Sequence, residues 1–147
     1  MPRNLLVVDD EPKICSVLKT FFEERGFRVS VATTAADALE QLDRLPAEAV
    51  LLDLRLPDQS GIEVLSQIKE RSPNLRVIVI SALSDPQTIQ EAFDRGASDY
   101  LTKPLDFSRC FYAAMGIDVV DVTTIQAEPE ALKRMPGSVA EQYRAVP

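Results

Sequence analysis

Histidine is absent from the 147-residue sequence, and cysteine occurs only twice. Without histidine, the chain cannot supply a His–Asp catalytic pair or a His-rich zinc site. Any metal ion is therefore expected to be a hard cation with oxygen ligands, such as Mg²⁺. Cys15 and Cys110 lie in apolar helical patterns and form no CxxC motif. They are expected to be core thiols of a protein in the reducing cytoplasm.

Positive charge and long apolar runs are also scarce. The chain has 16 Lys and Arg against 23 Asp and Glu, a formal net charge of −7. Such a chain has no basic surface for phosphate backbones, so we expect no direct binding to nucleic acid. No apolar run approaches the roughly 20 residues of a membrane span, and the N-terminus has no signal-peptide pattern. We therefore expect a cytoplasmic protein without a membrane segment.

What the sequence does contain is an alternation of short apolar runs with helical patterns. Several runs are β-branched and lack polar alternation, which is typical of strands buried on both faces of a parallel sheet. The predicted strands are 5–8, 27–32, 49–54, 76–80 and 98–102.

Each predicted strand is followed by a stretch with helical spacing. Pro12, the pair Ser60 and Glu63, and the pair Asp85 and Pro86 are helix-start signals. The first helix is expected to bury one face, formed by Ile14, Val17, Leu18, Phe21 and Phe22. Five such units predict an α/β fold, a flavodoxin-like doubly wound parallel sheet in the order 2-1-3-4-5.

Polar residues gather where the predicted strands end. Asp9 and Asp10 follow the first strand, Asp53 ends the third, Ser81 follows the fourth and Lys103 follows the fifth. In such sheets the ligand site lies at the carboxyl ends of the strands. Two carboxylates about 4 Å apart repel by about 4 kcal/mol at an effective dielectric near 20, so this cluster favours a divalent cation. With Mg²⁺ and a lysine present, a carboxylate can accept a phosphoryl group.

Four strings at these strand ends resemble the receiver domain of two-component response regulators. They are "VVDDE" at 7–11, "DLRLPDQSG" at 53–61, "VISA" at 79–82 and "DYLTKP" at 99–104. The resemblance covers roughly residues 3–115, so we assign a receiver domain to residues 1–115.

The resemblance implies that Asp53 accepts a phosphoryl group from a sensor histidine kinase or a phosphotransfer protein. Asp10, Asp53 and the main-chain carbonyl of Arg55 would bind Mg²⁺, and Asp9 would act through water. The protein would then be a signalling phospho-acceptor that catalyses its own phosphorylation and dephosphorylation, not an enzyme with a separate substrate.

The resemblance also implies a switch. Ser81 would hydrogen-bond the phosphoryl group, Lys103 would pair with it, and Tyr100 would rotate inward. The Lys103–Pro104 peptide bond would be cis. A homodimer through the face of the fourth helix, fifth strand and fifth helix is compatible with the resemblance.

Other interpretations stay open. Asp9 or Asp10 could be an N-cap for the helix at Pro12, and Tyr100 could be an edge residue with its hydroxyl in water. A pseudo-receiver that only binds proteins is one functional alternative. A Mg²⁺-dependent phosphohydrolase is another, although Arg55 stands where haloacid-dehalogenase-type enzymes need a second carboxylate.

Residues 116–147 do not fit the receiver pattern. We expect a C-terminal extension with a strand over 117–122 and helices around 129–135 and 138–143. A piece of about 30 residues cannot support its own core. Residues 110–147 weakly resemble part of the N-terminal domain of type II secretion and type IV pilus assembly ATPases, so the extension is alternatively the start of a second, truncated domain.

Overall fold

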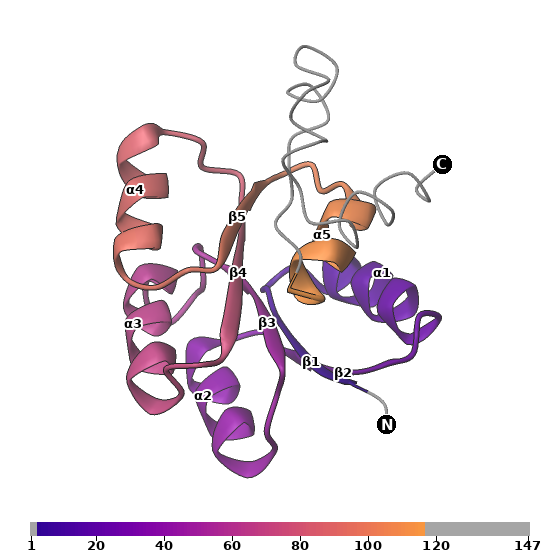
Figure 1. The fold of residues 1–147 in the computed structure, drawn as a ribbon. Coiled ribbons are helices and arrows are strands. Elements are labelled where there is room, and N and C mark those ends of the chain that lie inside the picture. The colour runs from indigo at the N-terminus through magenta and orange to yellow at the C-terminus, as the bar shows by residue number, and fades with distance from the viewer. Residues whose placement is uncertain (1–2, 117–147) are drawn as a thin grey trace.

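The computed structural model describes residues 3–116, in which strands and helices alternate along the chain (Figure 1). The strands are β1 (Arg3–Val8), β2 (Phe27–Ala32), β3 (Ala49–Asp53), β4 (Arg76–Ser81) and β5 (Asp99–Thr102). The helices are α1 (Pro12–Glu23), α2 (Ala35–Arg44), α3 (Gly61–Arg71), α4 (Pro86–Asp94) and α5 (Phe107–Ala114). The strand and helices predicted for the extension lie outside the described residues.

The five strands form one parallel sheet in the order β2-β1-β3-β4-β5, which confirms the predicted fold class. The chain reverses its direction of travel across the sheet after β2, so β1 and β3 are neighbours. Their carboxyl ends therefore meet near the middle of one edge, where doubly wound sheets bind ligands.

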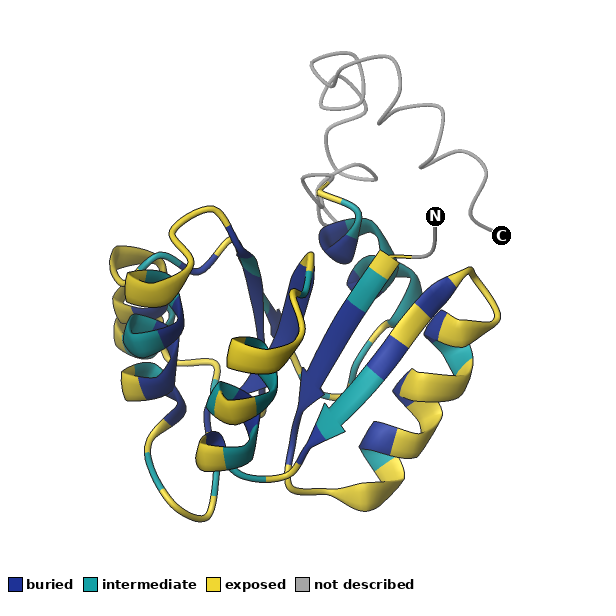
Figure 2. Cartoon of the chain, turned by 90° about the horizontal axis from the view of Figure 1, so that it is seen from below, coloured by how far each residue is buried: buried dark blue, intermediate teal, exposed yellow. Residues whose placement is uncertain are grey.

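Successive residues of each strand enter two different cores, because strand side chains alternate between the faces of a sheet. Helices α1 and α5 cover one face and α2, α3 and α4 the other (Figure 1). Leu5 and Val7 pack towards α1 and α5, whereas Leu6 and Val8 pack towards α2 and α3. Figure 2 shows the buried sheet between helices whose outer surfaces are exposed. Burial on both faces explains the unbroken apolar runs.

The predicted helix starts are largely confirmed. Asp85 accepts the N–H group of Thr88, three residues ahead. Thr34 caps α2 in the same way, accepting the N–H of Asp37. Ser60 accepts from Ile62 N–H, one residue earlier than a capping box would place the bond. Each cap satisfies an N–H that has no partner within the helix.

Two details of the helices differ from expectation. The N-cap of α1 is Glu11, so neither Asp9 nor Asp10 is the cap, although Asp9 Oδ1 accepts the Glu11 N–H at 2.9 Å. The inward stripe of α1 includes Cys15, and Val17 is 42% exposed. Val17 is exposed because the apolar residues of α1 cover a wider arc of the helix than the part that faces the sheet.

Both cysteines are buried and free, as predicted for core thiols. Burial raises the pKa of Cys15 to about 11 and that of Cys110 to about 12, so both remain neutral thiols at physiological pH. Among residues 3–116, no helix is both long enough and apolar enough to cross a membrane.

Gly61, the first residue of α3, lies against the backbone that follows Asp53. A Cβ at this position would lie 2.6 Å from the Asp53 carbonyl oxygen and closer still to Leu54 Cα. The Gly61 N–H donates to the Leu54 carbonyl at 2.9 Å. The absence of a side chain therefore allows α3 to begin directly beside the end of β3.

We expect Gly61→Ala to lower the free energy of unfolding by about 1–3 kcal/mol, because the new methyl group overlaps backbone atoms. Urea denaturation would measure the change. The control is Glu63→Ala, at an exposed position in the same helical turn. An unchanged stability for Gly61→Ala would contradict this account of the close approach.

Candidate functional site

The polar residues predicted to converge do so at one edge of the sheet. Asp9 directly follows β1, Asp53 and Ser81 are the last residues of β3 and β4, and Lys103 directly follows β5. The strands run parallel, so their carboxyl ends meet at the same edge. Asp9, Asp53 and Ser81 are the buried polar residues of this region, exposed by 0%, 4% and 0%.

Lys103 joins the two buried carboxylates. Its Nζ donates to Asp9 Oδ2 at 2.9 Å and to Asp53 Oδ2 at 3.1 Å. Burial alone would lower the pKa of Lys103, but the bonds to the two carboxylates outweigh it and the pKa lies above its ordinary value. The lysine is therefore a fixed positive charge within the site.

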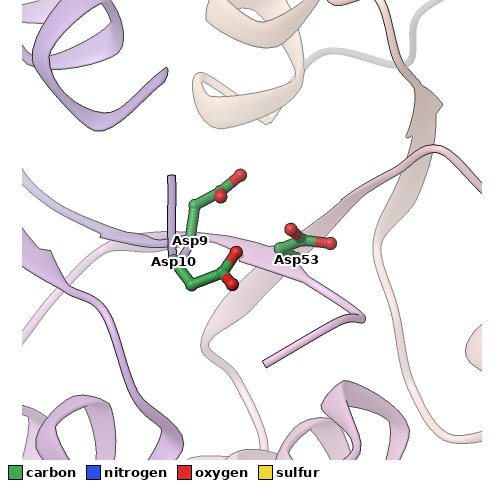
Figure 3. Close-up of side chains that lie close together, drawn as sticks. All are labelled: Asp9, Asp10 and Asp53. Atoms are coloured by element: carbon green, nitrogen blue, oxygen red, sulfur yellow. The ribbon is translucent and has the colours of Figure 1, made fainter. Parts of the chain in front are cut away.

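Asp10 completes an acidic cluster. Figure 3 shows Asp9, Asp10 and Asp53 brought together from the ends of β1 and β3. One carboxylate oxygen from each lies within 4.8 Å of the others. Asp10 is exposed, whereas Asp9 and Asp53 are buried. The cluster thus opens to solvent on the Asp10 side.

Asp53 is constrained on both carboxylate oxygens. Oδ1 accepts the Arg55 N–H at 3.1 Å, and Oδ2 accepts from Lys103. Burial raises the pKa of Asp53, and the charge of Asp9 adds to the increase, although the Arg55 N–H and Lys103 oppose it. The ionised form is therefore destabilised on balance, and a group that supplies positive charge would stabilise it.

The loop after Asp53 is held by its own backbone. An isolated antiparallel bridge pairs Arg55 with Ser60, and Gly61 N–H donates to Leu54. These bonds close residues 54–61 into a compact turn. The turn keeps the backbone of Arg55 beside the acidic cluster.

Ser81 and Tyr100 are linked through Leu83. Ser81 Oγ accepts the Leu83 N–H at 3.0 Å, and the Tyr100 hydroxyl donates to the Leu83 carbonyl at 2.7 Å. Tyr100 is partly buried, and this burial raises the pKa of its phenol. The alternative in which its hydroxyl points into water is wrong, because the hydroxyl has this main-chain partner.

The segment after β5 is tied to β4. Lys103 N–H donates to the Ser81 carbonyl at 2.7 Å. The Lys103–Pro104 peptide bond is cis, as the resemblance implied.

Sequence reasoning missed the contact made by Asp58, which accepts the N–H groups of Ala35 and Ala36. Leu83 could be placed beside the site from the sequence, but not the bonds by which its main chain joins Ser81 to Tyr100. Asp58 lies 23 residues from Ala35 in the sequence, so no local pattern could indicate the contact. Its position between Pro57 and Gly61 predicted only a loop.

The arrangement has the chemistry of a cation-assisted phosphoryl acceptor. Three carboxylates supply only oxygen ligands. Lys103 is the one ammonium in contact with them among residues 3–116, so these residues leave a net negative charge that fits a hard divalent cation. The Asp53 carboxylate lies within the same cluster, and a carboxylate so placed is chemically able to act as a nucleophile.

Comparison with known proteins agrees with this geometry. The family model of the response regulator receiver domain matches residues 5–114. The transcriptional regulatory protein ZraR of Klebsiella oxytoca is 39% identical over 106 residues, covering 72% of this chain and 24% of ZraR. KdpE of Mycobacterium tuberculosis is 44% identical over 102 residues, covering 68% of this chain and 44% of KdpE. The chain thus spans less than half the length of these curated relatives.

Solved structures show the same likeness. A response regulator from Burkholderia pseudomallei, with a phosphorylated aspartic acid, a calcium ion and citrate, has a TM-score of 0.74 at 28% identity and covers 90% of this chain and 75% of its own. The beryllofluoride-activated NtrC4 receiver domain dimer has a TM-score of 0.73 at 34% identity. The match covers 77% of this chain and 93% of the NtrC4 receiver chain. By its sequence, its sheet order and the residues at its strand ends, the chain belongs to the response regulator receiver domain family.

Proposed function

We propose that the protein is a phospho-accepting receiver, in which Asp53 takes a phosphoryl group from a phosphohistidine of a sensor histidine kinase or a phosphotransfer protein. The carrying observation is the Asp53 carboxylate, which is buried beside Asp9 and Asp10 and bonded to Lys103. The phosphorylated aspartic acid in the Burkholderia pseudomallei relative supports the same assignment. The pseudo-receiver and phosphohydrolase alternatives have no comparable support.

The reaction is an in-line displacement. A carboxylate oxygen of Asp53 forms a bond to phosphorus while the bond to the histidine nitrogen breaks, and that nitrogen leaves with the electron pair and takes up a proton. The product is an acyl phosphate. Lys103, already fixed between two carboxylates, pairs with a phosphoryl oxygen. The chain catalyses its own phosphorylation and dephosphorylation and has no separate substrate.

Asp10, Asp53 and the main-chain carbonyl of Arg55 are the proposed ligands of Mg²⁺, and Asp9 acts through water. When bound, the cation neutralises the charge that gathers on the phosphoryl oxygens. The calcium ion of the Burkholderia pseudomallei relative supports a divalent cation site of this kind.

Leu83 is the proposed link between phosphorylation and a change of conformation. Ser81 Oγ, which binds Leu83 N–H before phosphorylation, turns to a phosphoryl oxygen afterwards. Leu83 then loses the bond from its N–H to Ser81. The Leu83 carbonyl, which accepts from the Tyr100 hydroxyl, moves with the rest of the residue. This shifts a pre-existing equilibrium at the surface formed by α4, β5 and α5.

The surface formed by α4, β5 and α5 is also the proposed homodimer contact. Phe93 on α4 is 43% exposed and could contribute apolar contact area to such a dimer. The NtrC4 receiver, a relative of similar fold, forms a dimer.

The proposed domain division is a receiver at residues 1–115 and an extension at 116–147. The family match ends at residue 114, and α5 ends at Ala114. We place the protein in the cytoplasm, in keeping with its two free, buried thiols.

Acetyl phosphate with Mg²⁺ is expected to add one phosphoryl group to the wild-type protein and none to Asp53→Asn, because the amide is not a nucleophile. Intact-protein mass spectrometry measures the adduct, and a sample with EDTA tests its dependence on the cation. Full labelling of Asp53→Asn would overturn the assignment. No adduct on either protein, together with no binding of beryllofluoride, would favour the protein-binding pseudo-receiver.

Asp53→Asn is expected to raise the melting temperature by a few degrees at pH 7 in EDTA. The pKa of Asp53 is higher in the folded protein than its ordinary value of 3.8, so the folded protein disfavours the ionised carboxylate. The stability that Asp53 contributes is therefore fully present below pH 3.8 and is lost as the pH rises through the pKa of the folded state. The difference between the two proteins should therefore shrink as the buffer is made acidic. Circular dichroism measures both transitions.

Glu70→Gln, which removes the same charge from an exposed position, is the control for net charge. Mg²⁺ should stabilise the wild type more than Asp53→Asn. A less stable Asp53→Asn in EDTA at pH 7 would show that the bond to Lys103 outweighs the burial of Asp53.

A chain ending at Gly116 is expected to keep the melting temperature and the phosphorylation rate of the full chain, because the five strands and the two apolar cores described within residues 3–116 remain intact. Thermal unfolding and the mass assay measure the two properties. A large loss of either would show that the extension completes the receiver.

A further inference from the structure

The N-terminus of α2 receives caps from two places in the sequence. Thr34 accepts the Asp37 N–H at 3.1 Å, which is the local cap. Asp58, in the loop after Asp53, accepts the Ala35 N–H with Oδ1 at 2.9 Å and the Ala36 N–H with Oδ2 at 3.0 Å. A helix needs such partners for its first N–H groups, and one distant carboxylate here satisfies two of them.

The bonds of Asp58 fix the loop as well as the helix. Residues 54–61 are closed at their base by the Arg55–Ser60 bridge and by the Gly61-to-Leu54 bond. Asp58 lies at the far end of this turn and is itself exposed, so burial does not hold it in place. Its two bonds attach that end of the turn to α2.

The same turn carries the main chain of Arg55. The Arg55 N–H bonds Asp53 Oδ1 at 3.1 Å, and the Arg55 carbonyl is the proposed metal ligand. A rotation of the turn would displace both groups together, because the base bonds join Arg55 to Ser60. Anchoring the turn therefore helps to hold in place both the N–H that bonds Asp53 and the carbonyl proposed to bind the cation.

We infer that Asp58 is a positioning residue for phosphoryl transfer, holding the turn of residues 54–61 against the N-terminus of α2 so that the Arg55 main chain stays aligned with Asp53 and the cation. This inference rests on the proposed function. Asp58 touches neither the acceptor nor the reacting atoms and acts through Arg55. The two N–H bonds also lower the pKa of Asp58, so the carboxylate remains ionised at neutral pH.

Asp58→Ala and Thr34→Ala form a matched pair, tested in the full chain. Both remove caps from α2, but only the first releases the loop. Mg²⁺ affinity is measured by titrating the amide chemical shifts of Asp10 and Asp53 in NMR spectra. The Mg²⁺ concentration at half-saturation should rise about tenfold in Asp58→Ala, because losing a group that supports a metal ligand weakens metal binding by about this factor. It should stay unchanged in Thr34→Ala. Asp58→Asn, which keeps one acceptor oxygen, should restore part of the affinity.

Hydrogen exchange without metal ion provides a second readout. The amides of residues 55–60, other than Pro57, should exchange faster in Asp58→Ala and at the wild-type rate in Thr34→Ala. Equal effects of the two substitutions on Mg²⁺ affinity and on exchange would show that Asp58 is a helix cap only, and would overturn the inference. If the wild type is not phosphorylated by acetyl phosphate, the proposed function fails, whereas the exchange comparison still decides whether Asp58 anchors the loop.

Discussion

The ammonium group of Lys103 lies between the buried carboxylates of Asp9 and Asp53, in contact with both. One positive charge cannot balance these two carboxylates and the nearby Asp10, so the site keeps an excess of negative charge at the edge of an apolar sheet. Burial raises the pKa of Asp53, and the charge of Asp9 adds to the increase. The excess of negative charge makes the site suitable for a divalent cation and, with it, a phosphoryl group. The fold must hold these charges together against their repulsion, and its two apolar cores provide the stability to do so.

The parallel sheet holds them because β1 and β3 are neighbours whose ends are fixed by burial. Val8 pairs in register with Leu52, so the residues that come next in the chain, Asp9 and Asp53, arrive at the same level. Apolar side chains on both faces prevent the strands from shifting, since a slip of one residue would move every side chain to the opposite core. The precision of the site thus derives from the packing beneath it.

Two main-chain segments connect this rigid edge to the rest of the molecule. Leu83 is hydrogen-bonded through its N–H to Ser81, and through its carbonyl to Tyr100 on β5. The turn of residues 54–61 is bonded through Asp58 to α2. Both are loops that follow strand ends, where a small movement at the site can be transmitted without disturbing the sheet. The first lies on the side of the proposed switch, and the second supports the acceptor itself.

The sequence alone determined the element order, the sheet order and the groups at the strand ends, because apolar runs, helix caps and strand-terminal polar residues are local patterns. A local pattern also identified the cap Asp85. The exposed side chain of Val17 differed from expectation because the width of a helix contact depends on the surface it meets. Only the tertiary structure decided that Lys103 bridges Asp9 to Asp53, that Leu83 joins Ser81 to Tyr100 and that Asp58 reaches α2. Apart from the local bond between Ser81 and Leu83, these contacts link residues 17 to 94 positions apart, and their geometry depends on how the helices and loops pack around the sheet.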